Sequence, residues 1–311
     1  MARHAVASLI HLHNGDVVAL LARRSDIPGE HIAFRESLVT GPVTPEHDWI
    51  ETRARTLASR HGEDLLRVRT ELLEQEQLLD GLPSRGEVVL WFEHDLFCLA
   101  NLLYLLDRLH AAKLSLVWCP TPLGQFDERE LHLRFDSRAA VTPMMIAAAR
   151  EAWRAYTSEE ADALNALLAR DHPDFPFLRE GMTLHASRFP SPANGLGAIE
   201  QTILGLLSTG PLEFSTLFPQ VDSDPPRFGF GDAEVMVTLK AMAGRGVPLV
   251  TMSGQQPKVL FTITPAGENV LSGEVDDCKV NDPDTWLGGV HLTKENLWRW
   301  DGRVLSRSAV S

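Results

Sequence analysis

The chain has 311 residues, of which 44% are hydrophobic and 23% are charged, and its formal net charge is −13 at pH 7. This length predicts about two domains, and the composition is typical of a globular protein with a sizeable core. The negative charge argues against nonspecific attraction to nucleic acid or to anionic membranes, because both need local positive charge.

The three cysteines, Cys98, Cys119 and Cys278, lack metal-ligand spacing, and their odd number implies no disulfide framework. Cys98 and Cys119 stand in apolar runs, where a cysteine usually packs as a small hydrophobic residue. The longest apolar helical run, residues 96–106, is shorter than the roughly 20 residues that span a bilayer. We therefore expect a cytoplasmic protein that is not inserted in a membrane.

The first 140 residues alternate between predicted strands and predicted helices. Strands are predicted at residues 5–12, 30–34, 87–92 and 114–119, and helices at 17–24, 45–61, 63–79 and 96–109. This alternation is typical of a parallel sheet with helices on both faces, and it predicts a Rossmann-like α/β domain over residues 1–140. With an assumed strand order of 2-1-3-4, the first and third strands are neighbours, and their connections leave in opposite directions.

The rest of the chain has a different pattern. A helical connector is predicted over residues 141–193, with helical spacing from 142 to 170. Residues 194–273 predict three helices, a hairpin and a trailing helix, which together suggest a winged-helix-like domain with Asp232 capping the third helix. Residues 274–311 predict a short β tail in which 290–292 face 297–300.

Two polar clusters follow the first and third predicted strands directly, and a third group follows the second strand. The candidate residues are His13, Asn14, Gly15 and Asp16, then Arg35 and Glu36, and finally Glu93, His94 and Asp95. Functional groups gather at the carboxyl ends of parallel strands, so we expect these side chains to line one crevice.

Each group suits a chemical role. Arginine binds phosphate or carboxylate with a bidentate fork, so Arg35 would hold an anion. His94 would carry a proton, and Asp16, Glu93 or Asp95 would bind a metal or act as a base. In this interpretation His13, Asn14, Gly15, Asp16, Arg35 and Glu36 bind the ligand, and Glu93, His94 and Asp95 are catalytic. The sequence leaves the identity of any metal or cofactor open.

Simpler structural roles compete with these. Asp16 and Asp95 each stand where a helix begins, and aspartate is a favoured N-cap. Arg35 and Glu36 could form an ordinary pair in a loop, and Arg53 and Arg55 are expected to be solvated on a charged helix. No nucleophile motif such as Gly-X-Ser-X-Gly is present, and the glycines are too few for a P-loop or a dinucleotide fingerprint.

A family resemblance covers nearly the whole chain. It is carried by residues 14–16, 28–30, 35–36, 38, 41–42, 52–55, 90–96, 189–191, 194–196, 231–232, 288–292 and 298–301. Together these segments resemble the bacterial domain of unknown function (DUF) 1835 family. The resemblance implies membership of an uncharacterised bacterial family and no particular reaction.

Three functions remain open on the sequence. The favoured one is that the α/β domain binds a small anionic ligand, a nucleotide or phosphorylated metabolite, with hydrolase or transferase chemistry as one option. The second is a ligand-responsive transcriptional regulator, although residues 195–273 hold four Lys or Arg against seven Asp or Glu, a net charge of −3 that disfavours DNA. The third is a non-enzymatic protein-interaction module, and the oligomeric state is left open.

Overall fold

The computed structural model describes residues 8–45, 48–223, 226–255 and 258–308. The chain divides into two compact units. The first, which we call the sheet unit, comprises the described residues among 1–39, 45–155 and 170–181, and the second unit comprises those among 40–44, 156–169 and 182–311.

Five strands form the sheet of the first unit. They are β1 (Ser8–Asn14), β2 (Glu30–Phe34), β3 (Gly86–Glu93), β4 (Lys113–Cys119) and β5 (Ala139–Ala140), in the order β2-β1-β3-β4-β5. The first four run parallel, and β5 pairs antiparallel with β4. The predicted parallel α/β sheet and its assumed strand order are therefore confirmed, whereas β5 was not predicted. The start of the first predicted strand, residues 5–7, lies outside the described residues.

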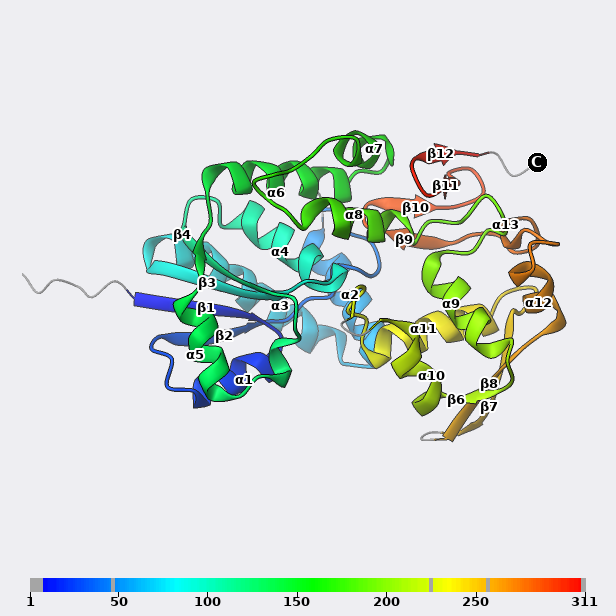
Figure 1. The fold of residues 1–311 in the computed structure, drawn as a ribbon, viewed down its shortest axis with the longest axis horizontal. Coiled ribbons are helices and arrows are strands. Elements are labelled where there is room, and N and C mark those ends of the chain that lie inside the picture. The colour runs from blue at the N-terminus through cyan, green and yellow to red at the C-terminus, as the bar shows by residue number, and fades with distance from the viewer. Residues whose placement is uncertain (1–7, 46–47, 224–225, 256–257, 309–311) are drawn as a thin grey trace, which may run out of the picture. The chain divides into compact units, whose positions relative to one another are not determined.

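Helices follow the strands. They are α1 (Asp16–Arg24), α2 (Trp49–His61), α3 (Leu65–Gly81), α4 (Leu96–Arg108), α5 (Glu128–Asp136) and α6 (Pro143–Tyr156), with 3-10 turns η1 (Leu82–Ser84) and η2 (Leu123–Gln125). All but α5 among these α-helices overlap a predicted helical segment. Figure 1 shows α1 and α5 on one face of the sheet and α4 and α6 on the other. Most of α4 is buried, as its nearly uniform apolar sequence predicts.

Side chains of the sheet alternate between its two faces. Val89, Trp91 and Val117 share one hydrophobic cluster with residues of α1 and α5. His13 pairs with Trp91 in the parallel ladder, so the carboxyl ends of β1 and β3 lie at the same edge of the sheet. The helices α1 and α4 begin from that edge, which therefore carries both polar clusters, as expected.

The second unit holds the remaining elements. They are α7 (Asp162–Leu168), most of α8 (Leu178–Ala186), α9 (Ala198–Leu207), β6 (Leu212–Glu213), α10 (Phe214–Val221), α11 (Asp232–Ala243), β7 (Val250–Gln255), β8 (Lys258–Ile263), α12 (Pro265–Leu271), α13 (Asp277–Val280), β9 (Thr285–Leu287), β10 (Val290–Leu292), β11 (Trp298–Trp300) and β12 (Leu305–Arg307). Strands β6, β8 and β7 form an antiparallel sheet. Three helices, a hairpin and a further helix thus stand where the sequence predicts them.

The predicted hairpin of the tail is wrong. Strand β10 pairs with β9, and β11 pairs with β12, so 290–292 do not face 297–300. Each pair has its own tight turn. Gly288 has a φ of +64°, which favours glycine, and the Asp301 carboxylate accepts hydrogen bonds from the backbone N–H groups of Arg303 and Val304, both at 2.8 Å.

Two further expectations need correction. The helical pattern over 142–170 is interrupted, because α6 ends at Tyr156 and α7 begins at Asp162. Asp232 is the first residue of α11 and not its cap. The N-cap is Gly231, whose N–H donates to Glu234 at 3.1 Å.

None of the helices among the described residues is both long and apolar enough to cross a membrane.

Candidate functional site

The chain leaves β1 through a turn at Gly15, where α1 begins. Gly15 has a φ of +95°, which favours glycine, and a Cβ built there would meet no heavy atom within 4 Å. Gly15 is the N-cap of α1, and no side chain caps this end of the helix. The expectation that Asp16 caps α1 is therefore wrong, and no side chain among the described residues caps the first-turn N–H groups of α1.

Arg35 and Asp16 form a bidentate ion pair at this end of α1. Nε of Arg35 donates to Oδ2 of Asp16 at 2.8 Å, and Nη2 donates to Oδ1 at 2.6 Å. The two side chains remain 62% and 64% exposed. Hydrogen bonds from Arg35 lower the pKa of the Asp16 carboxyl, so it is ionised at neutral pH. Arg35 thus pairs with Asp16 and not with its neighbour Glu36.

Glu36 points into the protein and pairs with Arg53. Both Nε and Nη2 of Arg53 donate to Oε1 of Glu36, at 3.2 and 2.6 Å. The expected solvated position of Arg53 is wrong, because this side chain is fully buried, whereas Arg55 is exposed as expected. A charge on the buried side of α2 needs an opposite charge, which Glu36 provides. A ligand at the sheet edge therefore cannot use Glu36.

Asn14 joins the end of β1 to α4. Its Nδ2 donates to the Cys98 thiol at 3.0 Å, and its Oδ1 accepts from Nδ2 of Asn101 at 2.8 Å. Asn101 is fully buried and also bonds the backbone of Glu36 and Leu38. No role was predicted for Asn101. The signal that could have found it is a lone amide within an otherwise apolar helix, because a buried amide needs partners.

Asp95 begins α4 as its N-cap, as expected. Its Oδ1 accepts from the backbone N–H of Cys98 at 2.7 Å. Glu93 accepts from the N–H of Leu123 at 2.7 Å, and burial raises the pKa of its carboxyl. One candidate ligand atom each from Glu93, Asp95 and Cys98 lies within 4.8 Å of the others. This set could hold a metal ion only if the Cys98 thiol lost its proton, and burial raises the pKa of that thiol well above its ordinary value.

His94 has different surroundings from Glu93. Its ring centroid lies 3.6 Å from that of Phe177 and 5.1 Å from that of Trp118. Its Nε2 is buried and has no hydrogen-bond partner among the described residues. Burial lowers the pKa of His94 to about 4, so the ring is neutral at pH 7. Glu93 and His94 therefore contact different groups: Glu93 accepts from the backbone of Leu123, and His94 lies against aromatic rings.

His13 lies in the core together with two other histidines. The ring centroids of His11 and His31 are 4.3 Å apart, and those of His13 and His31 are 5.2 Å apart. Burial lowers the pKa of His13 well below its ordinary value and that of His11 to about 4. The fully buried His13 is thus separated from Asp16 and Arg35, which are exposed.

Hydrogen bonds fix the tautomers of these three rings. A carbonyl only accepts, so Nε2 of His11 donates to Pro28 O at 3.1 Å, and Nε2 of His31 donates to Ile27 O at 3.0 Å. Nδ1 of the neutral His31 ring therefore accepts from Nε2 of His13 at 2.9 Å. Trp91 donates to Nδ1 of His11 at 3.0 Å. All three rings are neutral and carry their proton on Nε2.

No family model matches the chain. A search of curated proteins also finds no match. The resemblance to the DUF1835 family therefore stays a prediction.

Proposed function

We propose that the sheet unit is a Rossmann-like domain that binds a small anionic ligand at the carboxyl edge of its sheet, between the ends of β1 and β3. The observation that carries this proposal is the exposed Arg35–Asp16 pair beside the uncapped N-terminus of α1. The ligand class is a phosphate-bearing metabolite or nucleotide. The contacts would come from Asn14, Gly15 and Arg35, with Glu93 and Asp95 on the neighbouring strand end.

A helix N-terminus attracts an anion for two reasons. Its first backbone N–H groups lack intrahelical acceptors, and the aligned peptide dipoles place partial positive charge there. At Gly15 the missing Cβ leaves space for a ligand oxygen to approach the backbone closely. These are the features by which glycine-to-helix turns bind phosphate groups.

Asp16 is compatible with an anionic ligand because Arg35 neutralises its charge. Asp16 occupies Nε and Nη2 of Arg35, and Nη1 forms no hydrogen bond with the described residues. Nη1 can therefore donate to a ligand oxygen while Asp16 holds the guanidinium in place. In this role Asp16 positions Arg35 and does not touch the anion.

In this arrangement Glu93 would be the group that transfers a proton. Burial raises the pKa of its carboxyl, which favours the protonated form that a general acid needs. His94 lies against Phe177 and Trp118, which supports a separate role for it. We therefore propose binding as the primary activity, with Glu93 as the group suited to acid catalysis.

The second unit favours protein contact over DNA binding. The order of its elements, from α9 to α12, supports a winged-helix-like arrangement, in which α11 would be the recognition helix. Of the two cations predicted for this helix, Arg245 follows the end of α11 and pairs with Glu200 and Asp277. Lys240 alone remains on α11 for phosphate contacts, and DNA binders carry a larger basic surface.

The test is ligand-induced stabilisation against temperature. ATP, glucose 6-phosphate and pyrophosphate would be added to the wild type, to Arg35→Gln and to Arg55→Gln. Arg55 is a matched control, because it is also an exposed arginine paired with a carboxylate in the sheet unit. A ligand at about 100 times its Kd should add roughly 2.7 kcal/mol of stability.

We expect stabilisation of the wild type and of Arg55→Gln by at least one of these compounds, and its loss in Arg35→Gln. Equal stabilisation of all three proteins would contradict the site at Arg35. Failure of every compound to stabilise the wild type would contradict anion binding itself.

A further inference from the structure

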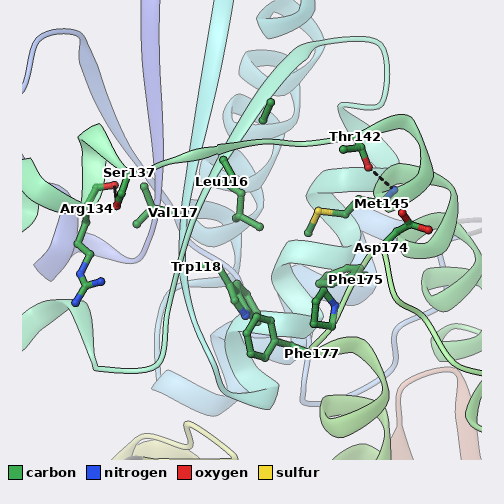
Figure 2. A pocket seen from close by; sticks show the side chains of 13 residues that line it. Leu116, Val117, Trp118, Arg134, Ser137, Thr142, Met145, Asp174, Phe175 and Phe177 are labelled. Carbon is green, nitrogen blue, oxygen red and sulfur yellow. Dashed lines mark hydrogen bonds between the residues drawn. The ribbon is translucent and has the colours of Figure 1, made fainter.

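A cavity of about 330 Å³ lies at the outer edge of β4 in the sheet unit. Figure 2 shows its walls, which come from β4, from the end of α5 and strand β5, from the start of α6, and from residues 174–177. Its volume falls in the range of small-molecule pockets, about 300 to 1,000 Å³. It shares no residue with the proposed anion site.

The cavity occupies a gap in the strand ladder. Strand β5 pairs only with Ser115 and Leu116 of β4, and the N–H of Val141 donates to the carbonyl of Leu114 at 3.0 Å. Backbone groups alternate in direction along a strand, so those of Trp118 point to the same side as those of Leu114 and Leu116.

Trp118 has no partner strand on this side. The position opposite it in the register falls on Ser137, whose N–H instead donates to the carbonyl of Leu133 at 3.1 Å. Among the described residues, no strand therefore pairs with the N–H and C=O of Trp118 at this edge. Trp118 and Ser137 both line the cavity. The N–H and C=O of Trp118 thus form a donor and an acceptor at the free strand edge beside the cavity that this residue lines.

Aromatic side chains form the floor of the cavity. Trp118 lies 5.5 Å from Phe177 and 6.4 Å from Phe175, measured between ring centroids. Figure 2 shows these three rings together, with Met145 and Leu116 above them. The indole N–H of Trp118 is also buried and has no acceptor among the described residues. A ligand with a flat ring would find stacking surfaces here.

We propose that this cavity binds the base of a nucleoside. A nucleobase is flat, and it carries a hydrogen-bond donor and an acceptor next to each other on one edge, which match the N–H and C=O of Trp118. The three rings and Met145 would cover its faces. Recognition needs no charge, so this site stands independently of the proposed anion site.

A peptide strand fits the cavity less well. Strand addition needs a long free edge, whereas only residues 117–119 of β4 extend past β5, and Pro120 follows. The free edge therefore offers one residue, Trp118, with both groups available on the cavity side.

The test is calorimetric titration with the four uncharged nucleosides adenosine, guanosine, cytidine and uridine. Ala140→Trp would fill the cavity from an exposed lining position, and Ser137→Trp would replace it if that variant did not fold. Ala147→Trp is the matched control, because Ala147 is exposed on α6 and does not line the cavity.

We expect at least one nucleoside to bind to the wild type and to Ala147→Trp, and its affinity to fall at least tenfold in Ala140→Trp. Methylation of the donor on the base edge, as in N6,N6-dimethyladenosine for adenosine, should weaken binding about tenfold, the usual loss for one hydrogen bond. Arg35→Gln should bind the nucleoside normally, which separates this site from the anion site.

Three results would overturn the proposal. They are the absence of binding for all four nucleosides at millimolar concentration, unchanged affinity in the cavity-filling variant, and unchanged affinity for the methylated base.

Discussion

Arg53 and Glu36 form an ion pair that solvent does not reach. Nη2 of Arg53 lies 2.6 Å from Oε1 of Glu36, and the two side chains are 0% and 3% exposed. The same guanidinium donates to the carbonyl of Ser37 at 2.9 Å. The pair therefore ties α2 to the segment that follows β2, close to the residue that carries the proposed anion contact, Arg35.

Removal of Arg53 should destabilise the sheet unit strongly. Arg53→Leu leaves the Glu36 carboxylate buried without a counter-charge, and breaking a buried pair in this way costs about 3–5 kcal/mol. Urea denaturation would measure the change in the free energy of unfolding. Arg55→Leu, the exposed control, should change it by less than about 0.5 kcal/mol. Equal values for the two variants would show that the buried pair does not stabilise the fold.

The two aspartates at helix starts should differ in their effect on stability. Asp95→Ala removes the side chain that caps α4, and we expect it to lower the free energy of unfolding by about 1 kcal/mol. Asp16→Ala breaks only an exposed ion pair and should change it by less than about 0.5 kcal/mol. Chemical denaturation of both variants is the measurement, and a larger loss for Asp16→Ala would reverse the assignment.

Stability should fall as the pH decreases below about 6.5. Burial lowers the pKa of His11, His13 and His31, so the folded state stays neutral at these rings while the unfolded state binds protons. Stability that these groups contribute is therefore complete above the unfolded pKa and is lost as the pH falls from 6.5 toward about 4, the pKa of His11 in the fold. Each such ring contributes a slope of up to about 1.4 kcal/mol per pH unit.

The Glu87 carboxylate acts in a lower pH window than the histidines. Although burial raises it, hydrogen bonds from Ser115 and Arg138 lower the pKa of Glu87 to about 2, so its contribution is lost only below its ordinary value of 4.5. Urea unfolding at pH 7, 6 and 5 therefore stays above the range in which Glu87 loses its contribution. The variant His31→Gln should show a shallower slope than the wild type, and equal slopes would assign the pH dependence to other groups.

The three cysteines should be unreactive in the folded protein. Cys98, Cys119 and Cys278 are all buried free thiols. Burial raises the pKa of each, to about 12 for Cys278, which suppresses the reactive thiolate. A thiol reagent such as 5,5′-dithiobis(2-nitrobenzoate) should label none within minutes and all three in guanidinium chloride. Rapid labelling of one thiol in native buffer would reveal local opening around it.

The sheet could be predicted because β3 and β4 are largely apolar runs and helical patterns separate the four parallel strands. Strand β2 begins and ends where its sequence indicates, and β3 differs by one residue at each end. Parallel strands then bring the ends of β1 and β3 to one edge, so the joint position of Asp16 and Asp95 near that edge also followed from the pattern.

Side-chain directions could not be predicted in the same way. Arg53 was expected in solvent because its helix is charged, yet it pairs with Glu36, which is distant in sequence. The strand β5 has only two residues and no apolar run, so it left no signal. Four segments between residues 116 and 177 line the cavity beside β4, and no local sequence pattern indicates that these segments pack together. These features arise from tertiary packing, which periodicity does not encode.

The three histidines His11, His13 and His31 form a hydrogen-bonded network that links β1 to the connection between α1 and β2. In one chain of hydrogen bonds Trp91 donates to His11, which donates to the carbonyl of Pro28. In the other chain His13 donates to His31, which donates to the carbonyl of Ile27. Both carbonyls belong to the connection between α1 and β2. Among the ring nitrogens of His11, His13 and His31, Nδ1 of His13 is the one that is buried without a hydrogen-bond partner among the described residues. A proton bound there would place a charge on a ring that is hydrogen-bonded through His31 to the carbonyl of Ile27, so the connection between α1 and β2 would respond to a charge on β1.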